Sequence, residues 1–149
     1  MKIKTSELTG LALDWAVAKA SERLGAWRRD ASRPGVSILD IDFDEHGELC
    51  EYVPGSRRDP YKPWRPSTDW SQGGPIKERE GIATRRHSSG TWYAMLSNDL
   101  GDGERAQWNE FTWNSWRTLF KGDSELQAAM RCFVASKLGD EVDVPEELL

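Results

Sequence analysis

The densest group of residues that could recognise a ligand lies between positions 66 and 80. The segment Pro66–Pro75 combines hydroxyl and amide side chains, an indole and two adjacent glycines, and Arg79 follows it. Hydroxyl and amide groups can meet an anion or the edge of a sugar, glycines let the backbone approach a ligand closely, and an indole offers a face for stacking. This composition predicts a loop that cradles a small anionic ligand.

Two interpretations of these residues stay open. In the binding interpretation, Trp70 stacks on the ligand, Arg79 and the loop amides meet a phosphate group, and Asp69 accepts a hydrogen bond from a ribose or a base. In the structural interpretation, the segment is a Pro/Gly turn held by a packed Trp70, with Asp69 capping local backbone amides. Asp14 is a further candidate, because it interrupts an apolar helix in which a carboxylate needs a hydrogen-bond or ion-pair partner. The predicted ligand-binding residues are Asp14, Thr68, Asp69, Trp70, Gln72, Gly73, Gly74 and Arg79.

Residues with catalytic or metal-binding chemistry are few and scattered. The chain has two histidines and two cysteines, His46, His87, Cys50 and Cys132. None has a partner at the spacing of a metal site or a catalytic triad. Acidic residues between positions 40 and 51 follow part of a calcium-loop pattern, but Glu45 stands where that loop requires glycine. We predict no catalytic residue, no metal and no cofactor, and a binding protein is favoured over an enzyme.

Charge is segregated along the chain. The formal net charge is -5, and residues 139–149 carry five carboxylates and no base, so the remainder is neutral. A second acidic block spans residues 40–51. Because duplex DNA is bound through a basic surface, the acidic balance makes general binding to duplex DNA an unfavoured function.

Length and composition indicate one domain spanning residues 1–149. A chain of 149 residues supports a single core, and its mean hydropathy of -0.69 without a long apolar run excludes a membrane span. The start of the chain does not resemble a secretory signal, and two cysteines fit a reducing compartment, so we expect a cytoplasmic location. Residues 140–149 are predicted to be an acidic tail.

Two helices are predicted to position the candidate residues. The first begins at Thr5 or Ser6 and runs to Leu24, with Gly25 as its C-terminal stop. It carries two apolar stripes on nearly opposite faces, so either two layers of the same chain cover it or one stripe meets a second subunit. We therefore expect a homo-oligomer. The second helix follows a capping box in which Ser124 is paired with Gln127, and it stops at Gly139.

Strands and an ordered loop are predicted between these helices. Residues 36–53 alternate as a hairpin whose turn is Asp44–Gly47, and Thr91–Leu96 is predicted to be a strand buried on both faces. The proline-rich segment from Pro54 to Pro75 is predicted to be irregular but ordered, because it contains aromatic residues. Aromatic residues between Trp108 and Phe120 are assigned to a strand. The predicted fold class is α+β, a small antiparallel sheet packed with an N-terminal and a C-terminal helix, with a long ordered Pro/Gly loop.

Three blocks of this sequence resemble the NinX-like family of small phage proteins. The blocks are Leu11–Ala18, Pro66–Ile76 with Glu78 and Glu80, and Ala128–Val142. The resemblance implies a phage or prophage accessory protein that acts in the bacterial cytoplasm. The family carries no established catalytic residues to transfer. This chain departs from the family's usual compactness at residues 97–119, which we interpret as an insertion.

Together, the residues and the resemblance suggest three functions. The leading hypothesis is a protein that binds and sequesters a small anionic ligand without turnover, with a host defence signalling nucleotide as one candidate. The first alternative is inhibition of a host DNA-directed enzyme by a DNA-like array of carboxylates on residues 40–51 and 140–147. The second alternative is a hydrolase that uses Asp14, Asp69 or Glu78 as general base, which requires a perturbed carboxylate in a cleft.

Overall fold

The computed structural model describes residues 1–25, 41–53, 60–96 and 119–149. In chain order, the helices and strands of these residues are β1 (Lys2–Lys4), the 3₁₀ helix η1 (Thr5–Glu7), α1 (Gly10–Ala20), β2 (Ile41–Phe43), β3 (Leu49–Tyr52), β4 (Tyr61–Pro63), α3 (Trp70–Arg79), β5 (Ile82–Arg86), β6 (Trp92–Leu96), β7 (Phe120–Gly122), α4 (Glu125–Leu138), β8 (Glu141–Asp143) and the 3₁₀ helix η3 (Glu146–Leu148). The predicted α+β class is confirmed. The strands form three small antiparallel sheets, β1-β8, β2-β3-β4 and β5-β6-β7, where one was predicted.

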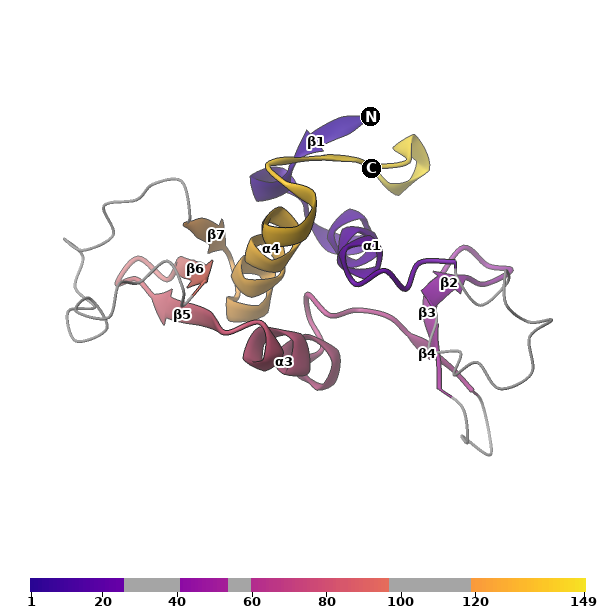
Figure 1. Cartoon of the computed structure of the whole chain (residues 1–149), viewed down its shortest axis with the longest axis horizontal. Coiled ribbons are helices and arrows are strands. Elements are labelled where there is room, and N and C mark those ends of the chain that lie inside the picture. Colours follow the sequence, from indigo (N-terminus) through magenta and orange to yellow (C-terminus); the bar gives the residue numbers. More distant parts are fainter. Residues whose placement is uncertain (26–40, 54–59, 97–118) are drawn as a thin grey trace.

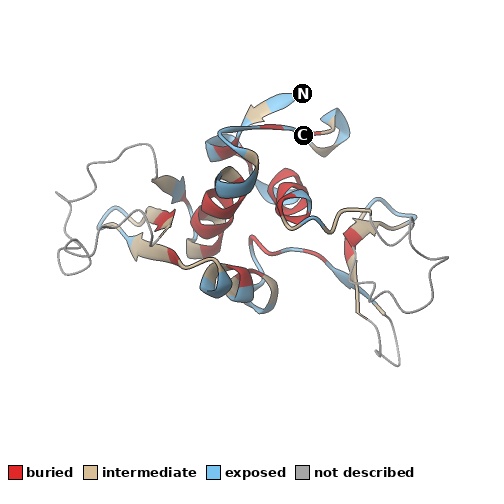
Figure 2. Ribbon diagram, viewed as in Figure 1, coloured by how far each residue is buried: buried red, intermediate tan, exposed pale blue. Residues whose placement is uncertain are grey.

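Helix α4 is the centre of the molecule (Figure 1). It contacts α1 and α3 as well as every strand of the β5-β6-β7 sheet. Figure 2 shows that buried residues concentrate on α4 and α1, and Met130 and Phe133 of α4 are among the largest fully buried side chains. Burial of apolar surface on these helices supplies most of the driving force for folding. In the described part of the chain, no helix is both long and apolar enough to cross a membrane.

The boundaries of α4 follow local signals, and the prediction for this helix is confirmed. The Ser124 hydroxyl accepts a hydrogen bond from the Gln127 amide at 3.1 Å, and Gln127 Oε1 accepts one from the Asp123 amide at 2.8 Å. The helix stops at Gly139, whose φ of 93° is readily adopted by glycine. Caps of this kind satisfy amides that have no partner within the helix.

Helix α1 is shorter than predicted at both ends. Leu8 and Thr9 separate η1 from α1, which begins at Gly10 with a φ of 50°. The hydroxyl of the predicted N-cap Thr5 donates a hydrogen bond to the Gly139 carbonyl at 2.6 Å. At the other end, α1 stops at Ala20, before Glu22, which has a left-handed φ of 57° and whose amide donates to the Lys19 carbonyl at 3.0 Å. Gly25 has the expected left-handed conformation, with a φ of 65°, but does not end the helix. A tertiary contact and an early left-handed residue therefore set the ends of this helix.

Both apolar stripes of α1 are covered within the chain. Leu13 and Val17 on one stripe and Leu8 and Ala18 on the other are buried, and among the stripe residues of α1 itself only Leu11 is exposed. The structure therefore corresponds to the option of two covering layers from the same chain. The two apolar stripes therefore no longer argue for a second subunit, and the homo-oligomer stays a prediction.

The hairpin prediction is confirmed where the structure describes it. Strands β2 and β3 pair antiparallel with Phe43 opposite Leu49, and residues 36–40 lie outside the described part. Asp44 Oδ1 holds the turn by accepting hydrogen bonds from the amides of His46 and Glu48 at 2.9 and 2.8 Å. Gly47 has a φ of 81°, which the turn requires.

The predicted irregular loop from Pro54 to Pro75 is wrong in two places. Tyr61–Pro63 is strand β4, which pairs with β3, and Trp70–Arg79 is helix α3, although it contains Gly73, Gly74 and Pro75. Residues 54–59 lie outside the described part. Glycine and proline have a low intrinsic propensity for helix. The packing of a helix against the rest of the protein can outweigh that propensity. Of the described residues 60–75, nine therefore lie in β4 or α3.

The two ends of the described chain pair with each other. Strand β8, predicted to be part of an acidic tail, pairs antiparallel with β1, and Val142 and Val144 are buried. The predicted strand at residues 91–96 is confirmed as β6. The aromatic region assigned to a strand lies almost wholly outside the described residues, as does the interpretation of 97–119 as an insertion. Of the aromatic region, Phe120 lies in β7.

Candidate functional site

The predicted binding residues are divided between the two ends of α3. Asp69, Trp70 and Gln72 lie at its N-terminal end and Arg79 is its last residue. Trp70 and Arg79 are nine positions apart in the helix, which corresponds to about 13.5 Å along its axis. One small ligand therefore does not contact both.

The polar groups at the N-terminal end of α3 are bound to neighbouring parts of the chain. Asp69 Oδ1 accepts hydrogen bonds from the Ser71 amide at 2.8 Å and the Ser71 hydroxyl at 2.6 Å, and the hydroxyl lowers the pKa of Asp69. Gln72 accepts from the Arg65 amide at 2.6 Å and donates to the Pro63 carbonyl at 2.8 Å. Asp69 thus caps α3, and Gln72 ties it to β4.

The two adjacent glycines of α3 have different surroundings. A β-carbon on Gly73 would overlap the carbonyl oxygen of Pro66 and lie 2.9 Å from Leu126 Cδ2. A β-carbon on Gly74 would meet only Trp70 Cε3, at an ordinary 3.5 Å. Gly73 therefore allows close packing of α3 against the preceding segment and α4. The space beside it is occupied by Pro66 and Leu126 and is not open to a ligand.

The remaining predicted residues of this end also have structural surroundings. The Thr68 hydroxyl is 3.5 Å from the Arg65 carbonyl. The Trp70 side chain is 53% exposed, so the packed indole of the structural interpretation is wrong. None of the residues that line the pocket described below belongs to this end of the helix.

Asp14 is buried in α1 and holds the segment that leads into α3. Its side chain is 5% exposed and accepts a hydrogen bond from the Ser67 amide at 2.9 Å, while the Asp14 carbonyl accepts one from Trp64 Nε1 at 3.0 Å. Burial raises the pKa of Asp14 to about 6, and hydrogen bonds from Ser67 act in the opposite direction. The partners of this carboxylate are thus the backbone amide and the hydroxyl of Ser67, where a loop Arg or Trp side chain was expected.

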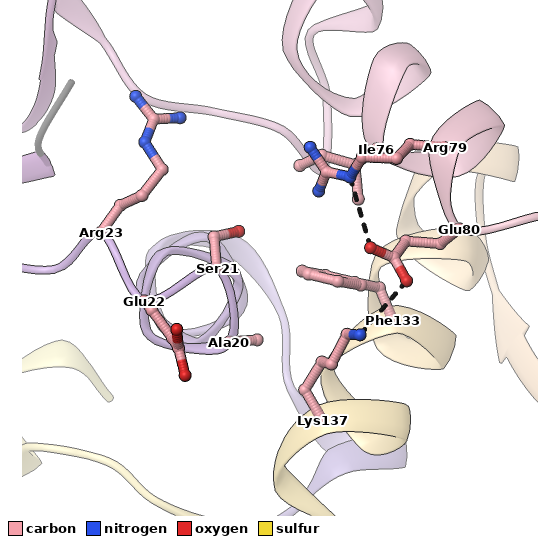
Figure 3. Close-up of a pocket in the computed structure, with 9 residues that line it drawn as sticks. All are labelled: Ala20, Ser21, Glu22, Arg23, Ile76, Arg79, Glu80, Phe133 and Lys137. Atoms are coloured by element: carbon pink, nitrogen blue, oxygen red, sulfur yellow. Dashed lines mark hydrogen bonds and ion pairs between the residues drawn. The ribbon is translucent and has the colours of Figure 1, made fainter. Parts of the chain in front are cut away.

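A pocket of about 410 Å³ lies where the C-terminal ends of α1, α3 and α4 meet. Its apolar lining is one residue from each helix, Ala20, Ile76 and Phe133, all buried. Arg79, one of the predicted binding residues, stands on its rim with Lys137 of α4 (Figure 3). A volume of this size accommodates a small molecule.

Glu80 organises the charges of this pocket. One of its carboxylate oxygens is 3.3 Å from Arg79 Nε and the other is 3.4 Å from Lys137 Nζ (Figure 3). The outer nitrogens of the Arg79 guanidinium point toward the end of α1 (Figure 3). Arg79 and Lys137 each have several N–H groups, so one shared carboxylate leaves donors for a ligand.

The end of α1 supplies the opposite wall. The Ser21 hydroxyl oxygen is buried without a hydrogen-bond partner in the described residues. Arg23 contributes its stem, because its guanidinium is bound to Glu51 at 2.8 Å and lies 5.2 Å from the Trp64 ring. Between them, Glu22 is the described non-glycine residue with a positive φ, 57°. Such a conformation is costly for a residue with a side chain and is frequent at binding sites.

Sequence reasoning missed most of this pocket. Ser21, Glu80 and Lys137 each lie near the C-terminal end of a helix, two of which were predicted. The available signal for the pocket was the adjacent pair of charged residues Arg79 and Glu80, which lie at the end of α3. Because α3 was not predicted, this pair could not be placed at a helix end from the sequence. No pattern along the chain showed that these three ends converge.

A second cluster could hold a metal ion. Ligand atoms of Asp44, Glu48 and Cys50 lie within 4.8 Å of one another. Asp44 is already used to hold the hairpin turn, and hydrogen bonds from the amides of Glu48 and His46 lower the pKa of its carboxyl group. Because these bonds explain the geometry, we assign no metal to the cluster.

The fold and the pocket define a small α+β protein whose candidate site is formed by the ends of three helices. The family model for Bacteriophage P22, NinX matches residues 4–137, so the chain belongs to this phage NinX family. The resemblance seen in the sequence is confirmed. No curated protein sequence matches the chain.

Proposed function

We propose that this phage accessory protein binds a small anionic ligand, without turnover, in the pocket between α1, α3 and α4. The observation that carries the proposal is the position of Arg79 and Lys137 on the rim of one pocket. Cationic donors that converge on a concave, partly apolar surface suit an anion with a small organic body.

The ligand we favour is a host signalling nucleotide that the protein sequesters. A phage accessory protein gains from removing such a signal, and binding alone achieves this. Of the residues predicted from the sequence, the proposal keeps Arg79. It leaves Thr68, Gln72 and Gly73 to their contacts within the chain and gives Trp70 and Gly74 no role.

The two alternative functions have less support. In the acidic hairpin, Glu48 and Glu51 are paired with Arg65 and Arg23, which weakens a DNA-like array of carboxylates. For hydrolysis, the three candidate bases Asp14, Asp69 and Glu78 do not line the pocket, and Asp14 and Asp69 are held in hydrogen bonds within the chain. A general base needs access to the substrate.

Calorimetric titration with inorganic phosphate, ADP-ribose and cyclic nucleotides tests the proposal. At least one probe should bind to the wild-type protein, and Arg79→Gln should weaken it at least tenfold. Arg65→Gln is the matched control, since the two arginine side chains are 60% and 61% exposed and each is paired with a glutamate, but Arg65 lies outside the pocket. It should leave the affinity unchanged.

Two results would overturn the proposal. The first is the absence of binding by every probe to the wild-type protein at millimolar concentration. The second is equal loss of binding in both arginine variants, because that result would show a general charge effect and no contribution from the pocket.

A further inference from the structure

A carboxylate of the chain itself lies between the two cations of the pocket. Arg79 Nε donates a hydrogen bond to one oxygen of Glu80 at 3.3 Å, and Lys137 Nζ lies 3.4 Å from the other oxygen (Figure 3). Each oxygen of the carboxylate therefore faces one cation. A ligand group that contacts both cations with two oxygens takes the position that the Glu80 carboxylate occupies.

The contacts of Glu80 are long for charged partners. Short hydrogen bonds between charged groups measure about 2.7–2.9 Å. The ion pairs Arg23–Glu51 and Arg65–Glu48 have this length, at 2.8 and 2.7 Å. The two cationic side chains that Glu80 faces are 61% and 45% exposed, so water and salt screen both contacts. Glu80 is therefore held less tightly by its partners than Glu48 and Glu51 are by theirs.

The place of Glu80 in α3 is unfavourable for a carboxylate. Glu80 is the C-cap residue of α3, beside carbonyl groups that carry a partial negative charge. The C-terminal end of a helix favours cations, and Arg79 and Lys137 lie in the last turns of α3 and α4. The end of α3 therefore stabilises the two cations and does not stabilise the carboxylate between them.

From these observations we infer that Glu80 is an internal competitor of the ligand, and that a phosphate group binds by displacing its carboxylate from Arg79 and Lys137. The inference rests on the proposed function and adds to it the position of the anionic group and the residue that limits its affinity. Once Glu80 is displaced, the two cations present two positive charges. A phosphate monoester, with a charge of about −1.5 to −2 at pH 7, balances them better than a carboxylate does.

Calorimetric titration of the full chain with inorganic phosphate tests this competition. Glu80→Gln keeps the length of the side chain and removes its charge, so phosphate should bind to this variant about tenfold more tightly than to the wild type. This factor is the effect of removing one repulsive charge at short range in a mostly aqueous environment. Unchanged affinity in Glu80→Gln overturns the inference.

Glu78→Gln is the matched control for net charge. Glu78 is an exposed residue of the same helix end and does not line the pocket. Its replacement removes the same charge from the protein and should change the affinity for phosphate by less than about twofold, because a solvated charge outside the site is screened. An equal gain in Glu78→Gln and Glu80→Gln overturns the inference.

Glu80→Asp separates the position of the carboxylate from its charge. The shorter side chain keeps the charge but does not reach both cations at once. Phosphate should bind to Glu80→Asp more tightly than to the wild type, and less tightly than to Glu80→Gln. If the affinity of Glu80→Asp equals that of the wild type, Glu80 acts only through its charge and the inference is overturned. The same variant carries the test should Glu80→Gln not fold.

The outcomes separate this inference from the proposed function. If phosphate binds to the wild type, is lost in Arg79→Gln and is unaffected by Glu80→Gln, the pocket binds anions and only the competition fails. If phosphate binds to Glu80→Gln while every anionic probe fails to bind to the wild type, the competition is supported and the proposed function fails. Absence of phosphate binding to both proteins overturns the inference.

Discussion

At the N-terminal end of α3, polar side chains are bound to the chain's own backbone, whereas at the C-terminal end they face a pocket. Asp69 accepts a hydrogen bond from the Ser71 amide. Gln72 accepts one from the Arg65 amide and donates one to the Pro63 carbonyl. Arg79 shares Glu80 with Lys137 and keeps donors directed toward α1 (Figure 3). Within one ten-residue helix, one end stabilises the fold and the other is available to a ligand.

The difference shows that composition alone does not indicate which polar residues of α3 face a pocket. The N-terminal end has the glycines, hydroxyls and indole that suggest a ligand cradle, yet Gly73 is needed because Pro66 and Leu126 approach it. The C-terminal end has an ordinary pair of charged residues. Its chemistry depends on Lys137 and Ser21, which arrive from other helices.

The largest expected effect comes from adding a methyl group at the packed end. Gly73→Ala should destabilise the protein by about 3 kcal/mol, because the new β-carbon overlaps the Pro66 carbonyl oxygen and α3 must move. The matched control is Gly74→Ala, which has space for a β-carbon and should stabilise α3 by roughly 0.5–1 kcal/mol. Urea unfolding of both variants measures the difference. Equal effects would show that the two glycines do not differ as described.

The buried carboxylate that supports the packed end should make stability depend on pH. Because the pKa of Asp14 is raised from 3.8 to about 6, the unfolded state ionises first, and stability should fall as pH rises from about 4 to about 6. Asp14→Asn keeps an acceptor for the Ser67 amide without the charge. It should be more stable than the wild type by up to about 3 kcal/mol at pH 7 and similar to it at pH 4. The check is urea unfolding at both values of pH, and a variant less stable at pH 7 contradicts the prediction.

Removal of the cap of α3 should have a smaller effect. Asp69→Ala loses the hydrogen bond to the Ser71 amide and should cost about 1 kcal/mol of stability. Because the lost contact is local, ligand binding at the other end of α3 should not change. Thermal unfolding and the titration described above provide the two measurements. Loss of binding in Asp69→Ala would mean that the two ends are not independent.

The smallest effect on stability is expected at the pocket. The Arg79 side chain is 61% exposed, and ion pairs of exposed side chains contribute little, so Arg79→Gln should change stability by less than about 0.5 kcal/mol. Thermal unfolding without ligand measures this. A large destabilisation would place Arg79 among the residues that hold the fold and would remove the contrast with the N-terminal end of α3.

Features with local causes were predicted well. The capping box of Ser124 and Gln127, the stop at Gly139 and the turn held by Asp44 depend on residues within a few positions of one another. Contacts between distant residues were not predictable. Arg131 is an example, because its buried guanidinium donates to the carbonyls of Leu8 at 2.8 Å and Lys121 at 2.7 Å. No sequence pattern predicts which carbonyls accept these hydrogen bonds.

The family, the α+β class, the C-terminal helix and the hairpin turn were all determined by the sequence alone, because helix periodicity, caps and turns are properties of short segments. Tertiary structure decided that Gly73 lies inside a helix, that β8 pairs with β1, and that Ser21, Arg79 and Lys137 meet at one pocket. The physical reason is that packing free energy outweighs local propensity, and packing partners are chosen only when the whole chain folds.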